Sequence, residues 1–152
     1  MKEATSQHLF SYWNEVRGDR IAPKRFEIEP SRIAQILPDT FILERIDVDT
    51  ARFRLAGTRI CEAFVAEFRG TNFFELFSLD DRVTLKHQFN LTARQGAVVV
   101  FTLQCATESG KTCTVEGIVA PLFHTRETVD RYLGSLAVHG APEWLGSEPI
   151  VS

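Results

Sequence analysis

Three strand-like segments in the second half of the sequence are separated by connections of only four residues. The segments span 97–107, 112–123 and 128–139, and the connections span 108–111 and 124–127. Connections of this length are typical of hairpins and are too short for a crossover between parallel strands. We therefore expect a three-stranded antiparallel meander, and the rest of the chain has to be compatible with it.

An earlier pair of strand-like runs forms a second hairpin. The runs, Thr40–Asp47 and Ala51–Gly57, are separated by residues 48–50. In the second run Phe53 and Leu55 alternate with arginines, including Arg54. Because side chains alternate across a strand, Phe53 and Leu55 are expected on an apolar sheet face and Arg54 on the opposite, charged face.

Helical patterns surround these strands. Leu9, Trp13 and Val16 recur at helical spacing, which predicts an amphipathic helix over 6–17 that ends at Gly18. Between the two hairpin regions the pattern predicts short helices, and Ser78 followed by Asp81 resembles a capping box for a longer one. The further helices expected are 31–37, 58–68, 73–77 and 80–95. The element order predicts one α+β domain.

The domain is divided by composition into three parts. Residues 1–38 form an N-terminal helix and a proline-containing connector, residues 39–139 form the core, and residues 140–152 form a tail rich in proline and glycine. A chain of 152 residues commonly has one hydrophobic core. We expect the tail to be loose.

Charge and cysteine content exclude several classes of function. The net charge is −3 from 17 basic and 20 acidic residues, with no long run of like charges, so a nucleic-acid or anionic-lipid surface is not expected. Cys61, Cys105 and Cys113 are too few and too widely spaced for a disulfide framework or a metal knuckle. The polar N-terminus lacks a signal peptide, which predicts a cytoplasmic protein without membrane insertion.

Several short motifs resemble the PAS family of alphaproteobacteria that was long described as a domain of unknown function. The motifs are Trp13 with Arg17-Gly18, the proline-bounded stretch 23–30, Ile36-Leu37-Pro38, the run 53–58, and Gly70 with the aromatic segment after it. The resemblance covers roughly residues 9–138. Val65-Ala66 stand where relatives more often carry Gly-Arg, and Glu27 stands where Asp is commoner, which puts a shared ligand in doubt.

The resemblance implies a PAS-like five-stranded antiparallel sheet, with short helices covering one face and leaving an interior pocket. PAS domains use such a pocket for small ligands and use the N-terminal helix for dimerisation. A stand-alone regulator of this kind would act on a signalling protein in trans. The candidates for the wall of an apolar pocket are Phe53, Leu55, Phe64, Phe73, Leu76, Phe89, Phe101 and Val115, with Arg54 or His87 as polar anchors. For each of them simple core packing is the favoured alternative. The candidates for a homodimer interface are Leu9, Trp13 and Val16.

Two cofactors are considered and neither is expected. Flavin-binding light sensors of the PAS class carry a cysteine where this chain has Phe73, so a cysteinyl flavin adduct is excluded. Haem-binding PAS domains take an axial ligand from the element that carries His87. The Leu85, Phe89 and Ala93 stripe lies on the other side of that helix, which favours a surface histidine, although Val83 and Leu91 form a weaker apolar face that leaves haem open.

No enzyme is predicted, because the sequence has no nucleophile elbow, phosphate loop, zinc-binding helix or paired Cys-x-x-Cys. Two alternatives stay open. A small curved-sheet isomerase or dehydratase would need an acid/base pair such as His87 with Glu116. A ligand-free dimerisation module would need no pocket at all.

Overall fold

The computed structural model describes residues 1, 3–64, 67–140 and 142–150. Within them the chain forms β1 Thr40–Asp47, β2 Thr50–Ala56, β3 Val99–Ala106, β4 Thr112–Phe123 and β5 Val129–His139. The helices are α1 Ala4–Arg17, α2 Thr58–Phe64 and α3 Leu79–Gln95, with 3₁₀ turns η1 Arg25–Glu27, η2 Pro30–Ile33, η3 Leu37–Asp39 and η4 Phe73–Leu76. None of the helices in this described part is long and apolar enough to span a membrane.

The five strands form one antiparallel sheet in the order β2-β1-β5-β4-β3. The expected α+β fold class and the expected strands are confirmed, with every strand bound within two residues of its predicted place. The expected helix over 31–37 is wrong. Two 3₁₀ turns, η2 and η3, replace it. Pro38 disfavours the α-helical conformation of the residue before it, and an α-helix therefore does not continue through this segment.

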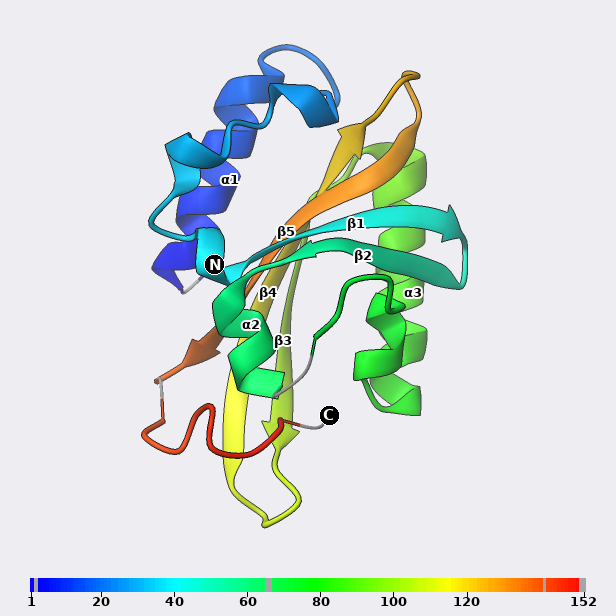
Figure 1. Cartoon of the computed structure of the whole chain (residues 1–152). Helices are drawn as coiled ribbons and strands as arrows, with labels where there is room; N and C mark the ends of the chain where they lie inside the picture. Colours follow the sequence, from blue (N-terminus) through cyan, green and yellow to red (C-terminus); the bar gives the residue numbers. More distant parts are fainter. Residues whose placement is uncertain (2, 65–66, 141, 151–152) are drawn as a thin grey trace.

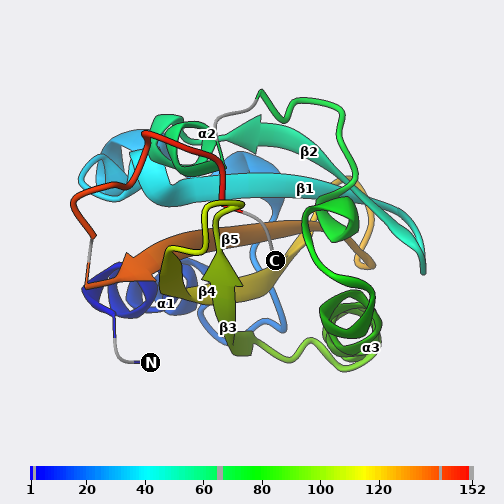
Figure 2. The ribbon, with the colours of Figure 1, turned by 90° about the horizontal axis from the view of Figure 1, so that it is seen from below.

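The sheet separates two layers of the molecule (Figures 1 and 2). We call the side covered by α2, α3 and η4 the inner face, and the side covered by α1 and the connector the outer face. Each face has its own cluster of buried side chains. The N-terminal segment therefore packs against the sheet of its own chain.

Aromatic rings fill the centre of the inner face. Phe73 of η4 is fully buried, and its ring centroid lies 5.2 Å from that of Phe41 and 5.3 Å from that of Phe89. Glycines in β4 and β5 make room for other rings: a Cβ on Gly117 would lie 2.2 Å from the Phe101 ring. Such close packing gives the inner face a core of interlocked aromatic rings.

The outer face is covered mainly by aliphatic side chains and by Trp13. Leu9 is fully buried and Trp13 is 3% exposed, while Val16 is half-buried. The indole Nε1 of Trp13 donates a hydrogen bond to the carbonyl oxygen of Pro121 in β4, at 2.9 Å. This hydrogen bond fixes the position of α1 on the sheet at one point.

A β-bulge in β2 changes which side chains share a face. Leu43 of β1 is opposite Phe53, and the preceding Ile42 is opposite Leu55, so Arg54 is the extra residue. Phe53 lies in the inner core, whereas Leu55 shares the outer side with Ile42 and is 37% exposed. The prediction that Phe53 and Leu55 lie on one face is wrong, because strict alternation fails at the bulge.

The C-terminal tail packs on the core instead of hanging loose. Ile150 is 3% exposed and its N–H donates to the carbonyl oxygen of Ala63 at 3.2 Å. Trp144 and Leu145 also pack against the inner cluster. The apolar residues among the prolines and glycines provide this contact, and they outweigh the flexibility that the composition indicated.

Candidate functional site

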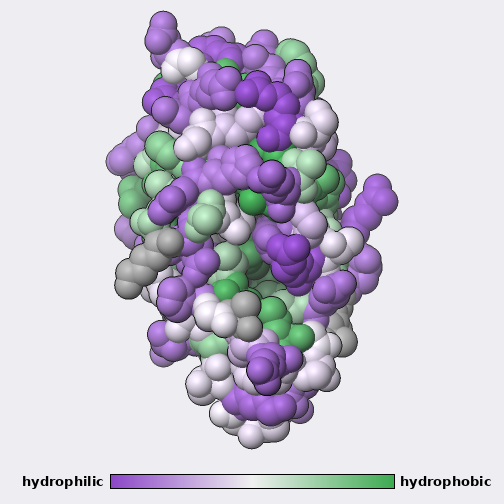
Figure 3. Space-filling model, turned by 90° about the vertical axis from the view of Figure 1, so that its left-hand side faces the viewer, coloured by the Kyte–Doolittle hydropathy of each residue, from purple (hydrophilic) through white to green (hydrophobic). Residues whose placement is uncertain are grey.

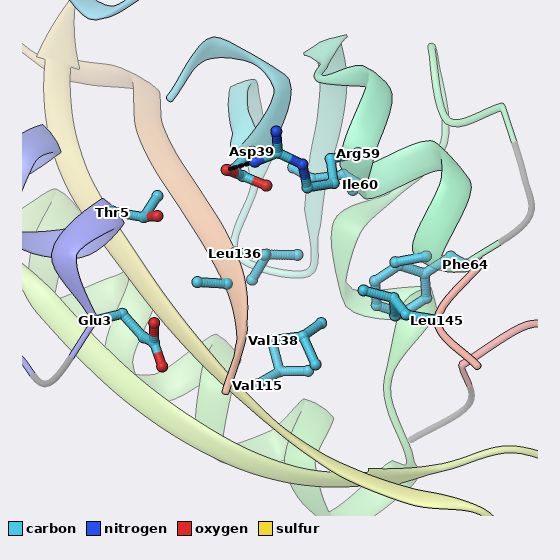
Figure 4. Close-up of a pocket in the computed structure, with 12 residues that line it drawn as sticks. Glu3, Thr5, Asp39, Arg59, Ile60, Phe64, Val115, Leu136, Val138 and Leu145 are labelled. Atoms are coloured by element: carbon cyan, nitrogen blue, oxygen red, sulfur yellow. Dashed lines mark hydrogen bonds and ion pairs between the residues drawn. The ribbon is translucent and has the colours of Figure 1, made fainter. Parts of the chain in front are cut away.

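A cavity of about 290 Å³ opens at the end of the sheet where β5 extends beyond β1. Six segments of the chain line it: the start of α1, η3, the helix α2, β4, the end of β5 and the tail (Figure 4). The apolar wall consists of Ile60, Ala63, Phe64, Val115, Leu136, Ala137, Val138 and Leu145. In Figure 3 apolar side chains lie in a hollow on this side of the molecule, with polar side chains around it.

One polar edge of the cavity is an ion pair between Asp39 and Arg59. An Arg59 guanidinium nitrogen lies 2.5 Å from Asp39 Oδ2, and the contact is drawn in Figure 4. Burial raises the pKa of the Asp39 carboxyl, and the positive charge of Arg59 opposes that rise. The Arg59 side chain is 55% exposed, so it can also reach a polar group of a molecule in the cavity.

The opposite polar edge is Glu3, immediately before α1. Its backbone N–H donates to Glu116 Oε1 at 3.2 Å, and its own carboxylate oxygen lies 2.5 Å from Nδ1 of His139. Thr5 is a further wall residue on the same helix end (Figure 4). These contacts tie the start of α1 both to the sheet and to the cavity.

The structure disperses the side chains that the sequence assigned to a ligand pocket. Only Phe64 and Val115 line the cavity described above. Phe53, Phe73, Phe89 and Phe101 are core residues of the inner face, and Leu76 is partly buried against them. Arg54 and His87 lie on the surface, as does Leu55.

The residues of the inner face do not fit the cysteinyl flavin adduct of the flavin-binding light sensors. Phe73 carries no thiol, and its ring is packed between those of Phe41 and Phe89. Burial raises the pKa of the Cys105 thiol to about 12, so this thiol stays protonated near neutral pH. His87 is exposed on α3 and does not fit an axial ligand for a haem held inside the core.

The acid/base pair considered for an enzyme is not assembled. Glu116 is 5% exposed and lies on the outer face, where the N–H of Glu3 donates to it. His87 is exposed on α3, on the other side of the sheet. The sheet therefore separates the two side chains.

Sequence reasoning missed most of the cavity. Asp39, Arg59, Ile60 and Leu136 belong to no motif, and Glu3 and Leu145 come from opposite ends of the chain. The available signal was Asp39, a carboxylate between Pro38 and an apolar strand, where a buried charge needs a partner. The sequence could not identify Arg59 as that partner. The departure at residues 65–66 lies outside the described residues.

The family comparison agrees with this architecture over most of the chain. A family model described as PAS domain matches residues 1–137. This range includes α1 and the connector as well as the whole sheet up to β5. No curated protein matches the chain.

Solved light-oxygen-voltage (LOV) structures have a similar fold. A LOV domain studied with a flavin analogue is 16% identical, with 73% of this chain and 84% of that chain covered and a TM-score of 0.56. The LOV protein of Rhodobacter sphaeroides is 12% identical, with 76% of this chain and 71% of that chain covered and a TM-score of 0.54. The RsLOV d2 variant is 14% identical, with 69% of this chain covered and a TM-score of 0.53. The match covers 61% of that protein, which is less than two thirds of its length.

Proposed function

Because the chain belongs to the PAS domain family, we propose that it is a sensory domain that binds a small amphipathic ligand in the side cavity. The observation that carries the proposal is the composition of the cavity wall. An apolar lining with a few polar groups at its edge is the usual make-up of small-molecule sites. A ligand with an apolar body and a polar group facing Arg59 would suit it.

A route from the cavity to the outer face follows from the same contacts. Glu3 is a cavity wall residue and, through Glu116 and His139, also holds the start of α1. A bound ligand that displaces Glu3 would alter how firmly α1 sits on the sheet. The proposed output is a change at α1 that a signalling protein detects in trans.

The proposed domain is a cytoplasmic regulator and not an enzyme. The separation of His87 from Glu116 removes the acid/base pair considered for catalysis.

A homodimer is a separate proposal. Leu9 and Trp13 are buried against their own sheet, so a dimer through them would require two copies to exchange α1. Light scattering of the purified protein measures its oligomeric state directly.

Native mass spectrometry of the purified protein tests the ligand proposal. We expect a small molecule to be retained and then released on denaturation. Ala63→Leu adds bulk inside the cavity and should abolish this retention, because Ala63 is 5% exposed and is a wall residue. Ala34→Leu is the matched control, since Ala34 is exposed on the connector.

Two outcomes would contradict the proposal. Retention of a ligand by a correctly folded Ala63→Leu variant would place the ligand elsewhere. Absence of any retained ligand, together with no thermal stabilisation by a library of amphipathic metabolites, would favour the ligand-free dimerisation module.

A further inference from the structure

A second hollow, of about 640 Å³, lies on the outer face at the end of the sheet away from the cavity. One wall is the connector around η1, the other is the β4–β5 loop, and the floor is formed by β1, β2 and β5. Its lining residues are Lys24, Arg25, Phe26, Ile42, Arg54, His124, Thr125 and Arg131, and we call it the cationic groove.

The groove has more positive charge than nearby carboxylates neutralise. Glu44 is shared by Arg54 and Arg131, with each nitrogen–oxygen pair at 3.3 Å. Arg131 forms one further ion pair, with Asp130 at 3.8 Å. Lys24 and Arg25 form no ion pair with any residue in the described ranges.

The connector wall is held in place by interactions that use its own carboxylate. Both Glu27 carboxylate oxygens accept from Arg20, at 2.7 and 3.0 Å, and Glu27 also accepts from the Lys24 backbone N–H. The Pro23 carbonyl accepts from the Phe123 N–H at the end of β4. The Glu27 carboxylate is thereby engaged mainly by Arg20, with a weaker electrostatic interaction with Lys24, and these contacts preorganise the wall.

Apolar surface accompanies the charge. Phe26 is 75% exposed at the edge of the groove, and Leu55, which the bulge turns outward, lies opposite Ile42 of the floor. An exposed aromatic ring beside arginine side chains is typical of protein-binding surfaces, where aromatic and arginine side chains are enriched.

We propose that the cationic groove docks an acidic segment of a partner protein that also carries apolar side chains. The groove is a local concave feature on a chain of net charge −3, so a long polyanion such as a nucleic acid would meet general repulsion. A short acidic segment avoids that repulsion, and its apolar residues can cover Phe26. The inference rests on the proposed function, because it supplies the surface through which the signal leaves the domain.

Fluorescence anisotropy with a short labelled peptide that alternates glutamate with leucine tests the inference. We expect saturable binding that weakens as salt is raised, and about tenfold weaker binding for Arg25→Glu and for Arg54→Glu. Lys111→Glu is the matched control, because Lys111 lies at the β3–β4 turn at the other end of the sheet and should leave the affinity unchanged (Figure 1). The same peptide with glutamine in place of glutamate should not bind.

Three results would overturn the inference. The first is that the acidic peptide does not bind even at millimolar protein. The second is that Lys111→Glu weakens peptide binding as much as Arg25→Glu and Arg54→Glu do. The third is that phosphatidylserine vesicles bind through the groove while the peptide does not bind. The Ala63→Leu variant separates this test from that of the cavity. Peptide binding that persists in Ala63→Leu supports the groove even where the ligand proposal has failed.

Discussion

Both faces of the sheet are buried, but side chains of different chemistry cover them. On the inner face Phe41, Phe53 and Phe73 are fully buried and pack ring against ring. On the outer face the cover includes buried polar groups, among them Ser6 of α1 and Ser135 of β5. The hydroxyl oxygens of these two serines have no hydrogen-bond partner within the described part of the chain.

This difference bears on how firmly each layer is held in place. The close packing of aromatic rings favours one well-ordered arrangement of the inner face, and the one buried oxygen without a described partner on α3 is Gln88 Oε1, outside the ring cluster. Buried hydroxyls without partners reduce the free energy that holds α1 on the sheet. Under the proposed function, the outer layer is the one that a bound ligand loosens while the inner core stays folded.

Truncation in the inner core should produce the largest effect. Phe73→Ala removes a ring that contacts several others, and we expect the free energy of unfolding to fall by about 4 kcal/mol. Urea titration followed by circular dichroism measures it. Phe26→Ala is the control, because Phe26 is 75% exposed and its loss should change stability by less than about 0.5 kcal/mol. Similar losses for both variants would contradict the description of the inner core.

A charge under α1 should separate the two layers. Trp13→Glu removes the hydrogen bond to Pro121 and buries a carboxylate, which should cost about 3 kcal/mol and release the N-terminal segment. Limited proteolysis should then cleave within residues 3–38, while circular dichroism still reports the sheet. Ser11→Glu places the same charge at an exposed position of α1 and should have neither effect. Complete unfolding of Trp13→Glu would show that the two faces form one cooperative unit.

Alkaline pH should weaken the inner face through Cys105. Burial raises the pKa of this thiol from its ordinary value of 9.0 to about 12. Between these values the unfolded chain loses the proton and the folded chain keeps it, so stability falls as pH rises. Near pH 11 the loss from this group is roughly 2 to 3 kcal/mol. Cys105→Val should show a correspondingly smaller decline in urea titrations from pH 7 to 11, and parallel declines would exclude this cause.

Removal of an orphan hydroxyl should give the smallest effect, with the opposite sign. Ser6→Ala deletes a fully buried oxygen that has no partner among the described residues, so we expect stabilisation by up to about 1 kcal/mol. Hydrogen exchange in α1 should slow at the same time. Ser11→Ala, at an exposed site, controls for helix propensity. A destabilised Ser6→Ala would mean that the hydroxyl does have a partner in solution.

The sequence predicted the fold far better than the site. Short connections and the caps at Ser78 and Gly96 are local signals, and the structure has the cap hydrogen bond from Asp81 N–H to Ser78 Oγ at 3.4 Å. The pocket prediction instead relied on alternation and on aromatic content. Alternation failed at Arg54, where a bulge adds one residue. Aromatic content did not distinguish a ligand wall from packed core, because both favour the same side chains.

The sequence by itself determined the element order, the antiparallel hairpins and the family, since turn length, caps and motifs act over a few neighbouring residues. Only the tertiary structure decided where the candidate sites lie. The cavity joins Glu3, Arg59 and Leu145, and the cationic groove joins the connector to β2 and the β4–β5 loop. Contacts between such distant residues depend on how the sheet curves and on which side of it each segment packs, and no local pattern encodes either.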